Sequence, residues 1–226
     1  MTPAMSVARA LVTACLDVGS VTSGGVGWAV DESHGLLHGC DLVDFVNALS
    51  GIVLNGGRIA LGFECPLYVP RRADPRQLAY QRIDEAGLNW CGGPGVAVLA
   101  TGLVQVNWVL SRLVECDRSL RATTRWGEFV EGHSRLFVWE AFITSRHGDP
   151  VVMPPDLPTC SLHERDAIAG LVAFTKRMVD AGELRSDLGA EPAISLIGMH
   201  LLMMGLSDAR NLLDERCMVV RARKPR

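Results

Sequence analysis

Apolar and polar residues follow two patterns along this chain, one typical of strands and one typical of helices. Short runs rich in β-branched and apolar residues predict strands at 10–18, 25–31, 58–65 and 134–142, and the runs 35–40 and 217–223 are further candidate strands. Apolar residues at helical spacing predict helices at 41–57, 95–117 and 161–182. The segment 66–95 is rich in Pro, Gly and Arg and predicts a long loop with a short helix near 75–86.

The order of these elements predicts an α/β protein with a mixed sheet. A glycine-rich turn joins the first two strands, which should pair antiparallel, whereas helical crossovers make the later strands parallel. We expect five strands flanked by helices, with strands 10–18 and 58–65 side by side. Asp17 and Glu64 end these two strands. Both acids would then surface at the carboxyl edge of the sheet, where open α/β sheets bind ligands.

Length and composition are those of a globular domain. The 226 residues are 48% hydrophobic, enough for a large core, and no linker divides the chain. We predict a single domain over 1–226, with an irregular insertion at about 66–95 and a C-terminal elaboration at about 183–226. The formal net charge of −3 gives the whole chain no basic field, so a nucleic-acid partner would need a local patch.

Cysteine usage and hydropathy predict a cytoplasmic protein without membrane contact. The seven cysteines form no CxxC pair, which argues against a disulfide framework or a structural zinc site and fits a reducing compartment. The first residues lack the sustained apolar stretch of a secretory signal. The most apolar late segment, 193–206, is shorter than the roughly 20 residues that cross a membrane.

Several stretches of the chain resemble the RNase H-like fold. Over roughly residues 11–180 the chain is similar to predicted RNase H-like nucleases known only as a domain of unknown function. The likeness is carried by "LDVGS", "GGVGWAV", "ALGFECPL", "GGPGVAVLATGLVQVNW", "LFVWEAF" and "HERDAIAGLVAF". The acids resemble those of RuvC-type Holliday-junction resolvases, in which a late helix presents two ligands three residues apart. His163 and Asp166 match this spacing, which places both on one helix face.

The resemblance implies a metal-dependent nuclease that hydrolyses phosphodiester bonds. Crowded carboxylates repel one another unless cations compensate, and two Mg²⁺ or Mn²⁺ ions about 4 Å apart can activate water and stabilise the leaving oxygen. By resemblance, Asp17 bridges the ions, and Glu64 and Asp166 are further ligands. His163 would be a ligand or a base beside the attacking water, and Glu140 an extra ligand or a nearby acid. The resolvase pattern requires no acid at 140, so the number of ions stays open.

A local basic cluster follows the second strand-ending acid. It consists of Arg71, Arg72, Arg76 and Arg82, interleaved with Tyr68 and Tyr80. These arginines could bind the substrate's phosphate backbone beside the metal ions. They could equally belong to a solvated loop balanced by Asp74, Asp84 and Glu85. The expected partner is nucleic acid, DNA or RNA, and a homodimer is one option for the assembly.

Each candidate residue also has a purely structural interpretation. Asp17 could cap a turn, and Glu64 could pair with a nearby arginine. Glu140 has apolar neighbours on both sides, so a buried ion pair with an arginine explains it nearly as well as a metal role. Asp166 is in the first turn of its helix, where the macrodipole alone favours acids, and His163 could be an ordinary helix residue.

Two other functions stay open at this stage. "DVGSVTSGG" resembles the phosphate-binding hairpin of the actin and sugar-kinase superfamily, which shares this fold and binds nucleotides. Those proteins duplicate the fold into two lobes, whereas this chain has one such hairpin. The other alternative is an RNase H-like domain that has lost its chemistry and only binds nucleic acid or protein. ATP binding would support the first alternative, and retained metal binding would separate a nuclease from the second.

Overall fold

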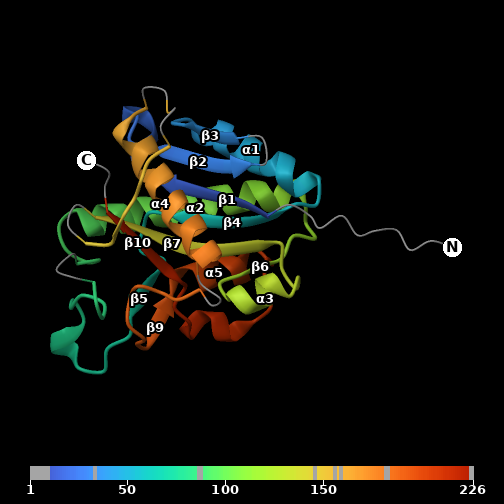
Figure 1. The fold of residues 1–226 in the computed structure, drawn as a ribbon. Coiled ribbons are helices and arrows are strands. Elements are labelled where there is room, and N and C mark those ends of the chain that lie inside the picture. The colour runs from blue at the N-terminus through green and yellow to red at the C-terminus, as the bar shows by residue number, and fades with distance from the viewer. Residues whose placement is uncertain are drawn as a thin grey trace.

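The computed structural model describes residues 11–32, 35–85, 89–144, 147–154, 157, 160–180 and 184–223, and its centre is a mixed β-sheet (Figure 1). Seven strands have the order β3-β2-β1-β4-β7-β10-β8, and an eighth strand, β6, pairs with β7. The strands of this sheet are β1 (Leu11–Asp17), β2 (Gly27–Glu32), β3 (Gly35–Gly39), β4 (Arg58–Phe63), β6 (Ala122–Thr123), β7 (Leu136–Thr144), β8 (Asp149–Pro150) and β10 (Val219–Arg223). Strands β5 (Tyr68–Pro70) and β9 (Ala193–Ser195) form a separate antiparallel pair.

The pairing directions confirm an α/β protein with a mixed sheet. Strand β2 pairs antiparallel with β1 and β3, whereas β1, β4, β7 and β10 are parallel neighbours. The predicted count of five strands is wrong, because the candidate runs 35–40 and 217–223 both form strands of the sheet, as β3 and β10, and the short strands β6 and β8 also belong to it. Strands β6 and β8 have two residues each, too few to leave a hydrophobic pattern in the sequence. Since β10 lies beside β7, the C-terminal part of the chain contributes to the main sheet.

Helices cover both faces of the sheet. Figure 1 shows α4 (Leu162–Asp180) in front of it and α1 (Leu42–Leu54) and α2 (Pro94–Cys116) behind it. The shorter helical elements are α3 (Trp126–Val130), α5 (Leu196–Met203) and the 3₁₀ turns η1 (Val21–Ser23), η2 (Pro75–Gln77) and η3 (Arg210–Asp214). Ala14 and Leu16 of β1 share a hydrophobic cluster with α1 and α2, while Cys15 belongs to the cluster that includes α4. Successive residues of β1 therefore contribute to two separate core layers.

Local signals set the ends of several elements. The Asp41 carboxylate accepts hydrogen bonds from the backbone N of Val43 and Asp44, at 2.7 and 3.1 Å, and so caps the start of α1. Helix α1 is followed by Gly56, whose φ of +70° suits glycine and turns the chain toward β4. Pro94 is the first residue of α2, where a missing N–H breaks no helical hydrogen bond.

The segment 66–95 is more irregular than the sequence suggests. The predicted helix near 75–86 is wrong, because η2 is the only helical piece in its described part, 75–85. Asp74 caps this single turn by accepting from the backbone N of Arg76, and Asp84 has a φ of +65°, which a continuing helix does not allow. The chain here is held by individual contacts rather than by helix periodicity.

Helix α2 is long and apolar enough to cross a membrane by length and composition alone, a test that core helices also pass. One side of it carries Val106, Val109 and Leu113, which are buried in the same cluster as α1 and β1. This packing is that of a core helix, although Val104 on its other side is 70% exposed. The apolar segment 193–206 forms β9 and the eight-residue α5 rather than a long helix.

Candidate metal centre

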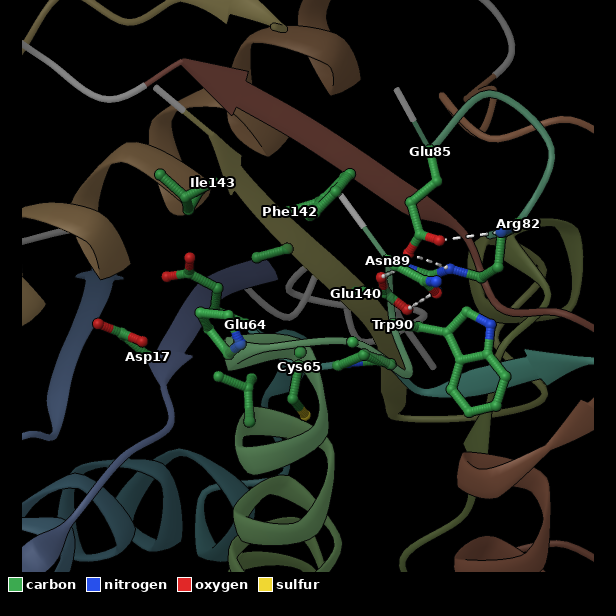
Figure 2. Close-up of a pocket in the computed structure, with 16 residues that line it drawn as sticks. Asp17, Glu64, Cys65, Arg82, Glu85, Asn89, Trp90, Glu140, Phe142 and Ile143 are labelled. Atoms are coloured by element: carbon green, nitrogen blue, oxygen red, sulfur yellow. Dashed lines mark hydrogen bonds and ion pairs between the residues drawn. The ribbon is translucent and has the colours of Figure 1, made fainter. Parts of the chain in front are cut away.

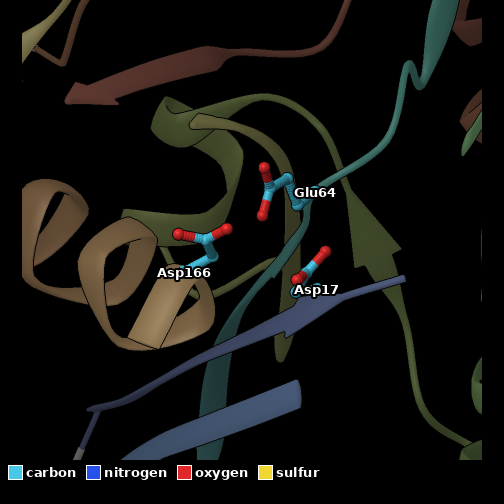
Figure 3. A group of neighbouring side chains, drawn as sticks. All are labelled: Asp17, Glu64 and Asp166. Atoms are coloured by element: carbon cyan, nitrogen blue, oxygen red, sulfur yellow. The ribbon is translucent and has the colours of Figure 1, made fainter. Parts of the chain in front are cut away.

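Three acids from distant parts of the chain meet at one edge of the sheet (Figure 3). Asp17 is the last residue of β1, and Glu64 directly follows β4. These strands are parallel neighbours, and the backbone N of Glu64 donates to the carbonyl of Leu16 at 2.8 Å, so the two ends are level. Asp166 arrives from the beginning of α4. Each acid offers one oxygen, and these oxygens lie within 4.8 Å of one another.

Helix α4 reaches this edge because glycine permits a close approach to the sheet. A Cβ at Gly27 of β2 would lie 2.0 Å from the carbonyl carbon of His163, so only glycine tolerates the first turn of α4 here. Gly170 allows a similar approach to β1, since a Cβ there would lie 2.9 Å from the Cys15 sulfur. The helix therefore rests on the hairpin and brings Asp166 to the end of β1.

His163 contacts the acidic cluster through Asp17. Its Nδ1 lies 2.7 Å from Asp17 Oδ2, and 38% of its side chain is exposed. Burial raises the pKa of the Asp17 carboxyl to about 6, and the charge of Asp166 adds to this rise, while the hydrogen bond and charge of His163 oppose it. A buried carboxyl with a raised pKa is stabilised in its charged form when a metal cation takes the place of its proton.

The turn after Asp17 is fixed by a residue that the sequence does not single out. Gln105 of α2 accepts from the backbone N of Gly19 at 3.3 Å, and its side-chain amide donates to the Gly19 carbonyl. The Gln105 side chain is buried and Gly19 is half-buried, so both hydrogen bonds are partly removed from water. No local signal could have identified this residue, because it lies 86 positions from its partner.

Glu140 belongs to a different cluster, with Arg82 and Glu85, and is not part of the group formed by Asp17, Glu64 and Asp166. Both of its carboxylate oxygens accept from the Arg82 guanidinium, at 2.7 and 2.8 Å, and one also accepts from the backbone N of Leu67 at 2.9 Å. Arg82 also donates to Glu85 at 2.9 Å. Glu140 lies in the middle of the buried strand β7, where a charge is tolerated only with such partners. The ion-pair interpretation of this acid therefore holds.

The four arginines do not form the predicted phosphate-binding cluster. Arg82 is 1% exposed and bound to acids, so it has no surface to offer a nucleic-acid backbone. The other three have separate acidic partners: Arg71 pairs with Asp214, Arg72 with Glu191 and Arg76 with Asp74. The balanced-loop interpretation named Asp74 and Glu85 as partners, and these two do pair with Arg76 and Arg82. Two of the partners come from the C-terminal part of the chain, which the sequence did not place nearby.

The acidic edge opens into a cavity of about 420 Å³ (Figure 2). Asp17 and Glu64 line one end of it, and Arg82 and Glu85 lie toward the other. Trp90 also lines the cavity. The candidate metal centre is thus continuous with an internal space large enough for a small molecule.

The three carboxylates fit a divalent cation. Mg²⁺ binds oxygen at about 2.1 Å, so two ligands of one ion lie up to about 4.2 Å apart. Shifts of less than an ångström would bring Asp17, Glu64 and Asp166 to such distances from their present 4.8 Å limit. An all-oxygen ligand set favours Mg²⁺ or Mn²⁺ over softer metals.

No family model matches this chain, and neither does any curated protein or solved structure. The class of protein supported by the observations is an α/β protein with a carboxylate cluster at the carboxyl edge of its sheet. Its chemistry follows from these residues and their surroundings.

Proposed function

We propose that this protein is a metal-dependent nuclease with an RNase H-like fold, which hydrolyses phosphodiester bonds in DNA or RNA. The proposal depends on one observation: Asp17, Glu64 and Asp166, from three separate elements, have carboxylate oxygens within 4.8 Å of one another. The strands β3, β2, β1, β4 and β7 support the fold, since an antiparallel hairpin is followed by parallel strands as the resemblance implies.

The residues divide the work between metal binding and positioning. Asp17, Glu64 and Asp166 would hold one or two Mg²⁺ or Mn²⁺ ions. Such ions supply Lewis-acid stabilisation of the charge on the phosphate oxygens. His163 positions one carboxylate oxygen of Asp17 through Nδ1. The other ring nitrogen, Nε2, is then available to bind or release a proton during the reaction. In the reaction water adds to phosphorus, one P–O ester bond breaks, and the leaving oxygen takes up a proton.

Calorimetric titration with Mn²⁺, paired with cleavage assays, tests this proposal. The wild type should bind Mn²⁺ and cut at least one of branched DNA, single-stranded DNA and an RNA–DNA hybrid. Asp17→Asn and Asp166→Asn should each lower Mn²⁺ affinity by about 100-fold or more, since even residues around metal ligands cost 10–100-fold. Asp74→Asn is the matched control, because Asp74 lies in a surface pair with Arg76. A wild type that binds no Mn²⁺ and cuts none of the three substrates overturns the proposal.

A further inference from the structure

The cavity beside the acidic cluster has two chemically different ends. Asp17 and Glu64 line one end, and the ring of Trp90 lies at the other (Figure 2). Its volume of about 420 Å³ falls within the range of roughly 300–1,000 Å³ that protein pockets for small organic molecules occupy. A molecule with a phosphate at the acidic end would therefore extend a second, sizeable group toward Trp90.

The wall between these ends is apolar. It includes Pro66, Val98, Ala141, Phe142 and Ile143. These side chains favour contact with an apolar or aromatic surface, because the contact removes apolar area from water. They provide no hydrogen-bond partner for a sugar hydroxyl or a charged group. The second group of the substrate should accordingly be flat and uncharged.

The far end offers a second phosphate little attraction. The Arg82 guanidinium lines this end, and its nitrogens already donate to Glu85 and Glu140 at 2.7 to 2.9 Å. Two carboxylates thus already balance the charge of Arg82, so this guanidinium has little left for an anion. A phosphate is favoured only at the opposite end, where bound metal ions would reverse the sign.

Trp90 is held in place before any ligand arrives. Its Nε1 donates to the Tyr80 carbonyl at 3.0 Å, and the neighbouring Asn89 amide donates to the Ala79 carbonyl at 3.1 Å. The Asn89 side-chain oxygen also accepts from the backbone N of Cys91 at 3.2 Å. An aromatic ring fixed by such contacts loses little entropy on binding and can stack on any base.

We infer that this cavity holds a nucleobase whose phosphate lies at the acidic cluster, so that the substrate is a nucleoside phosphate with an unpaired base. The inference rests on the proposed function and narrows its substrate. A base inside a duplex is paired at its edge and stacked on both faces, and it cannot enter a cavity without leaving the helix. Single strands, strand ends and free nucleotides share the required chemistry.

Binding measurements with matched probes test the cavity. Adenosine 5′-monophosphate and ribose 5-phosphate, each with Mn²⁺, differ only in the base. The wild type should bind the nucleotide at least about tenfold more tightly, as expected for stacking one base on an aromatic ring. Trp90→Ala should abolish this preference, and Trp90→Phe should keep most of it. Tyr80→Ala is the control, because this side chain is 59% exposed and its backbone carbonyl still accepts from Trp90.

The outcomes separate the cavity from the metal centre. Equal affinity for the two probes in the wild type, or an equal loss for both in Trp90→Ala, overturns the inference even if Mn²⁺ binds. Adenosine without metal adds a second readout, followed by ligand-observed NMR, since it carries no phosphate. If adenosine binds through Trp90 but Mn²⁺ does not bind, the proposed nuclease function fails and the base site stands.

Cleavage assays then show whether the base in the cavity belongs to single-stranded nucleic acid or to a free nucleotide. A single-stranded oligonucleotide should be cut at least about tenfold faster than its own duplex, and Trp90→Ala should slow the single-strand reaction by a similar factor. Nucleotide binding without single-strand cleavage would assign the site to free nucleotides. Equal cleavage of duplex and single strand would overturn the requirement for an unpaired base.

Discussion

Two groups of buried acids lie at opposite ends of one cavity, and they differ in the cation that accompanies them. At one end, Glu85 and Glu140 bind the guanidinium of Arg82, a permanent charge supplied by the fold. At the other end, Asp17 lies beside two more carboxylates and contacts a histidine ring that is partly exposed. Burial of an acid is therefore no sign of function by itself. Asp17, which contacts a histidine rather than a guanidinium, has more to gain than Glu140 from a cation bound from solution.

The largest effect should follow from removing the internal cation. Arg82→Met leaves the carboxylates of Glu85 and Glu140 buried without their guanidinium, which should cost roughly 3–5 kcal/mol. For a chain of this size, that loss lowers Tm by about 10 °C, measured by circular dichroism on heating. Arg76→Met is the control, and its Tm should match the wild type because its pair with Asp74 is on the surface. Equal Tm values for the two variants would contradict the structural role of Arg82.

The sequence located the acids at the sheet edge because each is tied to the end of a regular element. Asp17 and Glu64 end strands that the connection rules make parallel neighbours, and the structure has them level. Asp166 was placed beside them by the resemblance to the resolvases, since its spacing from His163 shows only that the two residues share a helix face. Positions fixed by strand order and helix period are accessible to reasoning from sequence.

The second group of acids could not be assigned from sequence. Glu140 was compatible with a metal site or an ion pair, and only the position of Arg82 decides between them. These residues are 58 positions apart, and the arginine lies in a segment without periodicity whose path depends on many individual contacts. Composition suggested a phosphate-binding role for Arg82, but burial overrides that suggestion. Irregular segments gain their structure from tertiary contacts, so their residues cannot be placed by local rules.

Asp17→Asn should make the metal-free protein more stable, whereas Arg82→Met makes it less stable. The Asp17 pKa is raised from 3.8 to about 6 on folding, so between these values the folded protein holds a proton that the unfolded chain has released. The contribution of Asp17 to stability is thus most favourable at low pH and falls as pH rises through 6, by about 3 kcal/mol. Without metal, the variant should melt several degrees above the wild type at pH 7.5, with no such gain at pH 4.

Metal provides the control for this prediction. Mn²⁺ should raise the Tm of the wild type, because it binds the folded state, and should leave that of Asp17→Asn nearly unchanged. Loss of the contact with His163 will reduce the gain of the variant, since that hydrogen bond is made by the carboxylate. A variant that melts below the wild type at pH 7.5 would mean that this contact outweighs the crowding of negative charge.

The smallest effect concerns the support beneath the metal centre rather than its acids. Gln105 both accepts from and donates to the backbone of Gly19, two residues after Asp17. In Gln105→Met both hydrogen bonds to Gly19 are lost while a side chain of similar length is kept, which should cost about 1 kcal/mol for each bond. Backbone amides of residues 19–25 should then exchange with solvent severalfold faster, and Mn²⁺ affinity should fall by less than tenfold. Ser111→Ala, which removes hydrogen bonds made only within α2, should change neither quantity. Unaltered exchange in Gln105→Met would show that the turn after Asp17 keeps its structure without the hydrogen bonds from Gln105.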